Sequence, residues 1–468
     1  MKFKKLACLF ATTAMACAVA LPLAACNKND DGVEIGEDGT ITVKEITMWV
    51  GGSEWSGRNW QNLQNFINDY NAIKPEGFTV DVRRKDDLEK AFQTSINDGK
   101  QPDLMLWDRF NTATNCIKGY LYGVDDLISR DSVDVSTFYA PVMNEMTYDG
   151  VTYGLPVDVD VWGTYVNMDY VAKYDEAHPD GAIAGKLTAN WTWNNLLDSA
   201  KALKTVATAG YSAGDQEQHL FKYYVSTGKG SEYLLPDTAS GIKGKYVTNF
   251  NNDHTKAILN FFKEVSEANV GGKQEDDSFT SAQLAMVNKP LYYNNQVKMS
   301  SKVKSYKFLP QPKPDASIMA GGVNGGMIGG YGIAYPAPNE AKGYKTKAWE
   351  ARHEAAWKFT KWLCTDKANM LKWSKDIGSL PALNEALNAD ECVEGNQVLA
   401  DARSYVQAKD GAGNLVYMTR PQVPNFLTLQ TDVINSTVTG FISGRLTLEA
   451  CLNDLTNTGN LKLALGLS

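Results

Sequence analysis

The stretch at residues 150–168, GVTYGLPVDVDVWGTYVNM, decides how the rest of the chain is interpreted. It favours strand throughout, and Pro156 is its one break. Asp158 and Asp160 are two residues apart, so on a strand both side chains point the same way. We expect a long strand whose two acids and Trp162 face a cleft.

Upstream of this strand, short apolar runs alternate with helical patterns. We expect strands at 45–50 (EITMWV), 78–84 (FTVDVRR) and 102–107 (PDLMLW), with helices at 59–73 and 86–98 between them. This alternation predicts a parallel sheet with crossover helices, and therefore an α/β fold.

Downstream, the pattern is helical with two long polar interruptions. We expect helices at about 193–206, 254–268, 352–363, 366–376 and 431–456. The glycine-rich stretches 207–252 and 384–424 are predicted to be irregular insertions. A chain of 468 residues is too long for one hydrophobic core, so we expect two lobes.

The N-terminus has the pattern of an export signal. A basic start, MKFKK, precedes an apolar run that ends in LAAC at residues 23–26. This ending resembles the bacterial lipobox, which implies a lipoprotein signal peptide over 1–25, a lipid on Cys26, and anchorage in the bilayer. Residues 26–42 are polar and are predicted to be a tether. An uncleaved membrane anchor is the alternative.

The net charge of the chain restricts the classes of partner that it is expected to bind. The formal net charge is −8, and removing Lys2, Lys4 and Lys5 with the leader gives −8 − 3 = −11. An acidic chain without a basic run is not expected to bind nucleic acid. Four cysteines remain after the leader and Cys26, and they are either disulfide-bonded or buried thiols: Cys116, Cys364, Cys392 and Cys451.

Motifs for metal, nucleotide or serine chemistry are missing from the sequence. The four histidines have no metal-ligand spacing, there is no GxSxG, and the glycine-rich run 321–335 lacks the Gly-Lys-Ser/Thr of a phosphate loop. We therefore expect no metal, no cofactor and no catalytic residue. The alternative is a glycan-degrading enzyme that uses Asp158 or Asp160 as its acid.

Aromatic and polar side chains occur together at several points, a mixture that suits sugar binding. An indole covers the apolar face of a sugar ring, while carboxylates and amides bond its hydroxyls. The mixtures are WVGGSEW (49–55), LWDRFN (106–111), DVDVW (158–162), YYNNQ (292–296), GGYG (329–332) and PNF (424–426).

Most of the tryptophans have a simpler explanation in packing. Trp357 and Trp362 lie within a predicted helix, and Trp49 ends a predicted strand. Trp55, Trp107 and Trp162 are harder to assign to a core. We expect these three to contact a ligand.

Four motifs, in order over residues 96–382, resemble the extracellular solute-binding proteins of carbohydrate-type ABC importers, a family similar to maltose-binding proteins. They are INDGKQPDLMLWD (96–108), GVTYGLPVDVDVWGTYVNMDYVAKY (150–174), TWNNLLDSAKALK (192–204) and the run from IGGYGIAY to SLPA (328–382). The insertions 207–252 and 384–424 have no clear counterpart in that family.

The resemblance implies a periplasmic-binding-protein-like fold with a ligand cleft between two lobes. Lobe one would hold 40–157 plus 307–377, and lobe two 158–306 plus 378–468. The lobes would close by hinge motion around a carbohydrate, which we expect to be an oligosaccharide. The protein would act as a monomer and deliver this ligand to the ABC permease.

Matching the motifs to the family's cleft gives a set of ligand-binding candidates. Ser53, Glu54 and Trp55 are in the loop after the first strand. Open α/β sheets bind their ligands beside the carboxyl ends of the strands, which is where this loop is expected. The others are Trp107, Asp108, Asp158, Asp160, Trp162, Tyr293, Asn294, Tyr331 and Phe426. A non-sugar solute in the same cleft is a second alternative.

Overall fold

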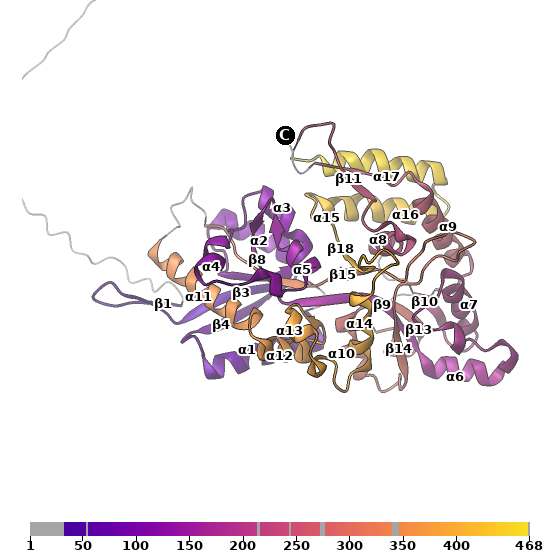
Figure 1. Cartoon of the computed structure of the whole chain (residues 1–468), viewed down its shortest axis with the longest axis horizontal. Coiled ribbons are helices and arrows are strands. Elements are labelled where there is room, and N and C mark those ends of the chain that lie inside the picture. Colours follow the sequence, from indigo (N-terminus) through magenta and orange to yellow (C-terminus); the bar gives the residue numbers. More distant parts are fainter. Residues whose placement is uncertain are drawn as a thin grey trace, which may run out of the picture.

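The computed structural model describes residues 32–52, 55–212, 216–242, 245–271, 277–338 and 346–466. Two lobes lie side by side, each around its own β-sheet (Figure 1). We call the part around the five-stranded sheet lobe one and the part around the seven-stranded sheet lobe two. The predicted fold class, α/β with two lobes, is confirmed.

Lobe one has the predicted parallel strands at its centre. β3 (Glu45–Gly51), β4 (Thr79–Lys85) and β5 (Leu104–Asp108) are parallel, and β16 (Tyr331–Ala334) lies antiparallel between β5 and β8 (Gly154–Pro156). The order β4-β3-β5 sends consecutive crossovers in opposite directions, so right-handed connections put α1 (Gly57–Ile73) and α2 (Leu88–Asp98) on opposite faces.

Local sequence signals fix the ends of these helices. Asp87 caps α2 by accepting a hydrogen bond from the backbone N–H of Lys90, and Gly99 ends the helix with φ 66°. The C-terminal helices α11 (Lys347–Cys364) and α12 (Lys367–Ile377) return to lobe one, where α12 packs against α1. Lobe one is therefore built from two separate parts of the chain.

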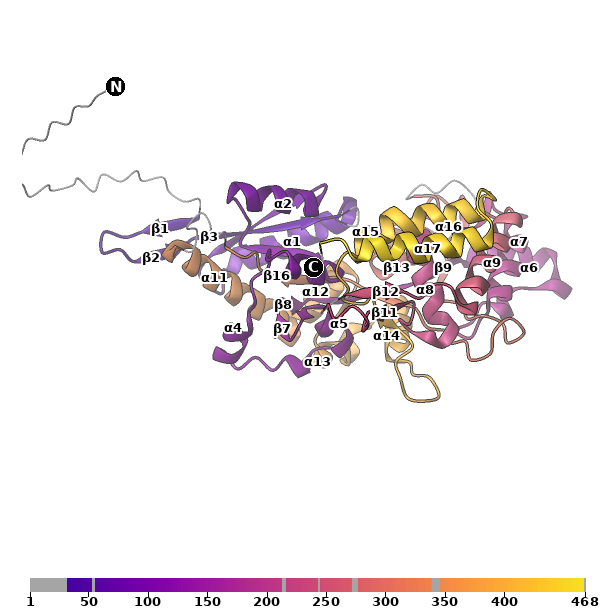
Figure 2. The same cartoon turned by 90° about the horizontal axis from the view of Figure 1, so that it is seen from above.

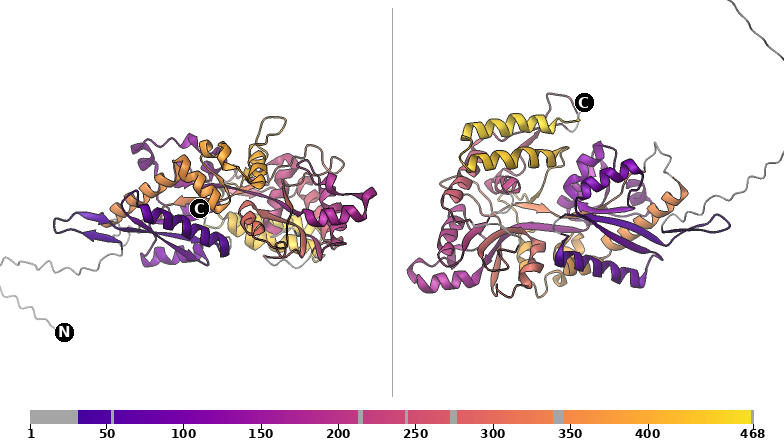
Figure 3. Two further views of the ribbon diagram at one scale, coloured as in Figure 1. Left: turned by 90° about the horizontal axis from the view of Figure 1, so that it is seen from below. Right: turned by 180° about the vertical axis from the view of Figure 1, so that it is seen from behind.

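Lobe two is organised around β9 (Asp158–Asn167), the strand predicted from 150–168. The strand order of its sheet is β10 (Ala209–Ser212), β13 (Leu284–Pro290), β9, β15 (Met327–Gly329) and β18 (Met418–Thr419). Two further strands, β14 (Tyr306–Leu309) and β17 (Leu380–Pro381), also pair with β9. Figure 3 shows this strand running from the boundary between the lobes into lobe two.

Helices surround this second sheet. They include α6 (Met168–Ala177), α7 (Trp193–Lys204), α8 (Gln216–Tyr224) and α9 (Asp253–Glu267). The pair α16 (Asn435–Ile442) and α17 (Leu448–Leu463) packs together on the outside of the lobe (Figure 2). Thr192 and Asn195 start α7 with a capping box, which explains why the helix begins at Trp193.

The chain changes sheets at places that differ in part from the expected lobe boundaries. It leaves the first sheet after Pro156 and joins the second at Asp158, next to the expected boundary at 157/158. The return falls between Gly329 and Tyr331, because β14 and β15 still pair with β9. The expected return at 307 therefore lies within lobe two. After α12, β17 pairs with the start of β9.

Three local expectations are corrected. The insertions are not irregular throughout, because the first contains β10 and α8 and the second contains α14 (Gln397–Gln407). The helix expected over 431–456 is two helices, broken at Gly444 with φ 75°. Part of the expected tether is a hairpin of β1 (Val33–Ile35) and β2 (Ile41–Val43). Cys26 and the leader lie outside the described residues.

Within the described ranges, none of the four remaining cysteines is paired with another, and three of them are buried. In the same part of the chain no three His, Cys, Asp or Glu side chains gather as a metal would require. Of the helices that the structure describes, none has the length and apolar composition needed to cross a bilayer.

Candidate functional site between the lobes

The loops that follow β3 and β5 lie at the edge of lobe one that meets lobe two. Trp55, from the loop after β3, packs edge-on against Tyr331 with ring centroids 5.0 Å apart. Both rings line a pocket with Asp158 and with Tyr292 of lobe two. The pocket holds only about 10 Å³, near the minimum that one water needs, so a sugar would require the lobes to move apart.

Asp158 stands where the chain passes from one lobe to the other. Its carboxylate accepts hydrogen bonds from the backbone N–H of Tyr331 (2.7 Å) and from the hydroxyl of Ser379 (3.2 Å). These partners lie on the other two segments that pass near the boundary. Burial raises the pKa of Asp158 to about 7, against the opposing effect of Arg109.

Arg109 is a site residue that the sequence analysis did not single out. Its fully buried guanidinium donates to the carbonyl oxygens of Asp158 (2.8 Å), Gly329 (2.6 Å) and Tyr331 (2.7 Å). Its Nε–H donates to Glu145 at 3.0 Å. Burial raises the pKa of Glu145 to about 7. The available signal was its position beside Asp108 in LWDRFN.

Asp160 does not face a free cleft. It is 4 % exposed, and its carboxylate accepts from the backbone N–H groups of Leu291 (2.9 Å) and Tyr292 (3.4 Å). Burial, together with the nearby Asp158, raises the pKa of Asp160 well above its ordinary value. Its role in this conformation is to hold the turn after β13.

Asp108 reaches across to lobe two. It pairs with Arg420, which follows β18, and its side chain remains 30 % exposed. The Arg420 guanidinium also lies over the ring of Phe110, with its central carbon 4.0 Å from the ring centroid. The residues around Arg420 form none of the aromatic and polar mixtures that predict a site, so Arg420 could not be predicted from its local sequence.

Trp162 is half-buried on the lobe-two side of the boundary. Lys222 Nζ lies over its ring, 3.8 Å from the centroid. A Cβ at Gly329 would come 3.6 Å from Arg420 and 3.7 Å from the indole nitrogen of Trp162. Gly329 therefore brings the backbone close to both side chains.

Four of the expected ligand contacts are packed side chains instead. Trp107 is 2 % exposed against Phe92 in the core of lobe one, and Tyr293 is 3 % exposed against Tyr165. Asn294 accepts from the Tyr306 hydroxyl at 2.8 Å, and Phe426 is fully buried. In this conformation these four have almost no surface left for a ligand, and the same holds for Trp55, Asp158 and Tyr331, which are 2 %, 2 % and 6 % exposed. Ser53 and Glu54 lie outside the described residues.

The site thus combines rings, acids and two arginines, Arg109 and Arg420, from both lobes. Trp55 and Tyr331 place their rings on the lobe-one side, where they are only 2 % and 6 % exposed and would be uncovered only by a parting of the lobes. Trp162 and Tyr292 are half-buried on the lobe-two side. Asp108 and Arg420 add paired charges that hydroxyl groups can bond. This chemistry suits recognition of a polar, ring-shaped solute more than bond cleavage.

Comparison with known proteins gives one family for most of the chain. Residues 65–400 match the family model described as bacterial extracellular solute-binding protein. The chain is 23% identical over 262 residues to a lactose-binding protein of Rhizobium radiobacter, covering 54% of this chain and 58% of that one. It is 24% identical over 347 residues to a maltotriose-binding protein of Pyrococcus abyssi, covering 71% and 65%.

These matches span about three fifths of the two relatives. Among solved structures, the fold is similar to that of maltose-bound MalE3 of T. maritima, with a TM-score of 0.70 at 17% identity. That similarity covers 90% of this chain and 100% of the other. At this identity the likeness supports the fold.

Proposed function

The chain belongs to the bacterial extracellular solute-binding proteins, and from this premise we propose that it captures a carbohydrate, an oligosaccharide by preference, for an ABC importer. Its family is one of binding proteins, so the glycan-degrading alternative is dropped. The proposal rests above all on the meeting of Trp55 and Tyr331 with Trp162, Asp108 and Arg420 at the boundary between the lobes.

The side chains at this boundary match the apolar ring face and the hydroxyl-bearing edge of a sugar. The rings offer apolar faces to its C–H groups, and the Asp108–Arg420 pair offers an acceptor and donors to its hydroxyls. The names of the relatives support the same class, because one is a lactose-binding and the other a maltotriose-binding protein.

Capture would proceed by closure of the lobes on the solute. The ligand favours the closed form only to the extent that it binds that form more tightly than the open one. Rings and polar groups contributed by both lobes supply this difference, because either lobe alone offers only part of the contacts. Arg109 and Asp158 would keep the crossing segments aligned as the lobes rotate.

Delivery would require the protein to stay near a permease at the membrane. We place a lipid on Cys26 for this purpose, with the permease subunits and the bilayer as partners and the protein as a monomer. Replacing Cys26 with Ala should release the protein into the medium when cell fractions are compared. Retention of the C26A variant in the membrane fraction would argue for the uncleaved anchor.

A solute screen tests the proposed function. The purified protein is titrated with maltotriose, lactose and mannobiose, and with a dipeptide, spermidine and citrate as non-sugar solutes, while thermal unfolding is followed. A sugar at 100 times its Kd should stabilise the protein by about 2.7 kcal/mol. Stabilisation by the dipeptide, spermidine or citrate alone would point to a non-sugar solute in the same cleft.

A further inference from the structure

A segment near the C-terminus, residues 418–426, connects lobe two to lobe one, and we call it the strap. At its start, β18 pairs in parallel with β15 of the lobe-two sheet. Farther along, Arg420 pairs with Asp108, and the backbone N–H of Asn425 donates to the Thr114 hydroxyl at 3.2 Å. Asp108 is the last residue of β5 and Thr114 lies six positions later, so the strap lies against lobe one.

The strap is firmly fixed to lobe two. Val423 and Phe426 are buried in the lobe-two core, where Phe426 packs against Phe221 with centroids 4.8 Å apart. The side-chain amide of Asn425 donates to the carbonyl oxygens of Leu463 and Leu465 at the end of α17. Movement of lobe two relative to lobe one therefore moves the strap.

Two strap residues bury polar atoms without a partner. Arg420 is 6 % exposed, and its Nε–H makes no hydrogen bond to any residue that the structure describes, although a terminal nitrogen binds Asp108. The nitrogen and the oxygen of the Gln422 side-chain amide are both buried, and neither has a partner within the described part of the chain. Glu145, across the boundary in α5 (Ala140–Glu145), also has a carboxylate oxygen without a partner among the described residues.

Such atoms are exceptions in folded proteins, because a buried polar group without a hydrogen-bond partner destabilises the form that buries it. Here they belong to the segment that lies against the opposite lobe. The unmet polar atoms therefore destabilise the ligand-free closed form. A ligand that supplies the missing hydrogen-bond partners removes this destabilisation.

We infer that Arg420 and Gln422 recognise the hydroxyl groups of a neutral sugar and couple that contact to closure of the lobes; this inference rests on the proposed function. A carboxamide offers one acceptor and donor N–H groups, and a hydroxyl offers the complementary set. Because the charge of Arg420 is already matched by Asp108, the strap has no spare charge for a sugar acid or sugar phosphate.

Two substitutions in the strap should shift the empty protein in opposite directions. Gln422→Met removes the unmet amide at similar volume, so the closed fraction without sugar should rise at least about fivefold. Arg420→Met removes the bond to Asp108 and should lower that fraction. Arg130→Met is the matched control, because Arg130 pairs with Glu354 inside lobe one.

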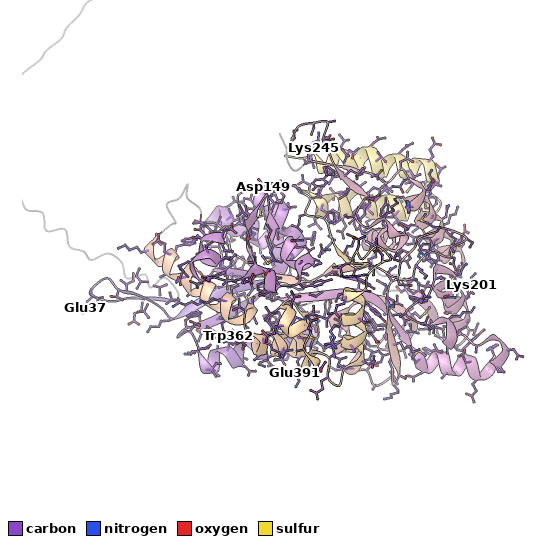
Figure 4. The ribbon with its side chains drawn as sticks, viewed as in Figure 1. Glu37, Asp149, Lys201, Lys245, Trp362 and Glu391 are labelled. Carbon is purple, nitrogen blue, oxygen red and sulfur yellow. The ribbon has the colours of Figure 1, made fainter. Side chains whose placement is uncertain are left out.

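The readout is the distance between the lobes. Fluorophores attached through unnatural amino acids at exposed Glu350 on α11 and Lys201 on α7 (Figure 4 labels Lys201) report closure by energy transfer, with thermal unfolding as a folding check. Maltotriose, lactose and mannobiose are the sugar probes. Each sugar that binds wild type should bind Gln422→Met at least about tenfold more weakly.

The outcomes separate the two proposals. If wild type binds none of the sugars, the proposed function fails and this inference fails with it. If wild type binds a sugar but Gln422→Met changes neither the empty closed fraction nor the affinity, only this inference is overturned. A shift by Arg130→Met as large as that of Arg420→Met would also overturn it.

Discussion

The Asp158 carboxylate accepts a 2.7 Å hydrogen bond from the backbone N–H of Tyr331, a residue that lies 173 positions later in the chain. The bond joins two of the segments that pass between the lobes. Arg109 binds the carbonyl oxygens of the same two residues, so one arginine and one aspartate hold the boundary together.

Removal of Arg109 should destabilise the protein strongly. Arg109→Met leaves Glu145 and Asp158 buried without their cation, which we expect to cost about 3–5 kcal/mol in the free energy of unfolding. Urea denaturation measures this change. Arg130→Met, at an exposed ion pair, should change it by less than about 1 kcal/mol. Equal effects of the two variants would contradict the role of Arg109.

Stability should fall as the pH rises from about 5 to about 7. Glu145 and Asp158 have folded pKa values of about 7, raised by burial from 4.5 and 3.8. The folded form therefore binds more protons in this window. The stability contributed by these protons is fully present below the ordinary pKa values and is lost as the pH rises through 7.

Glu145→Gln isolates one of these two groups. The variant should flatten the pH dependence of the unfolding free energy, on the order of 1 kcal/mol per pH unit for the group removed. Denaturation curves collected at pH 5, 6, 7 and 8 provide the comparison. An unaltered slope in E145Q would mean that Glu145 is ionised across this range.

Gly330 should not tolerate a side chain. Its φ is 121°, and an added Cβ would stand 2.3 Å from the Asp158 carboxylate and 3.0 Å from Arg109. Gly330→Ala should therefore destabilise the protein by about 1–3 kcal/mol or more. Gly185→Ala is the control, because a Cβ there meets no atom within 4 Å. Comparable melting temperatures for the two variants would refute this prediction.

Substitutions of Trp107 and Trp162 should affect different properties, one mainly the stability of the fold and the other mainly sugar affinity. Trp107→Ala opens a cavity in the core of lobe one and should cost about 3–5 kcal/mol in stability, with little effect on sugar affinity once folded. Trp162→Ala, at a half-buried ring, should weaken sugar binding at least about tenfold with a smaller loss of stability. Calorimetric titration and thermal unfolding of both variants measure the two effects.

The sequence predicted those features that depend on local pattern. β3, β4, β5 and β9 all lie where apolar runs and alternation placed them, and the change of sheets near Pro156 follows from the run at 150–168. The helix at 431–456 was predicted as continuous because periodicity alone does not show that Gly444 takes a positive φ. Local pattern also gave no warning of α8 and α14 within polar stretches.

The site was less predictable because its residues are assembled from distant segments. Arg109 is explained by partners up to 222 positions away, which no local pattern reveals. Trp107 looked like a ligand contact at a strand end, but its side chain points to the face of the sheet covered by Phe92 of α2. Arg420 is identified as a site residue only by its ion pair with Asp108 of the other lobe.

The position of β16 bears on how the protein is made. This strand lies inside the first sheet, between β5 and β8, yet it ends at Ala334 of a 468-residue chain. A ribosome must therefore synthesise the whole first stretch of lobe two before the sheet of lobe one is complete. Until β16 is made, β5 and β8 have no strand between them, so the N-terminal segment alone cannot complete the native sheet of lobe one.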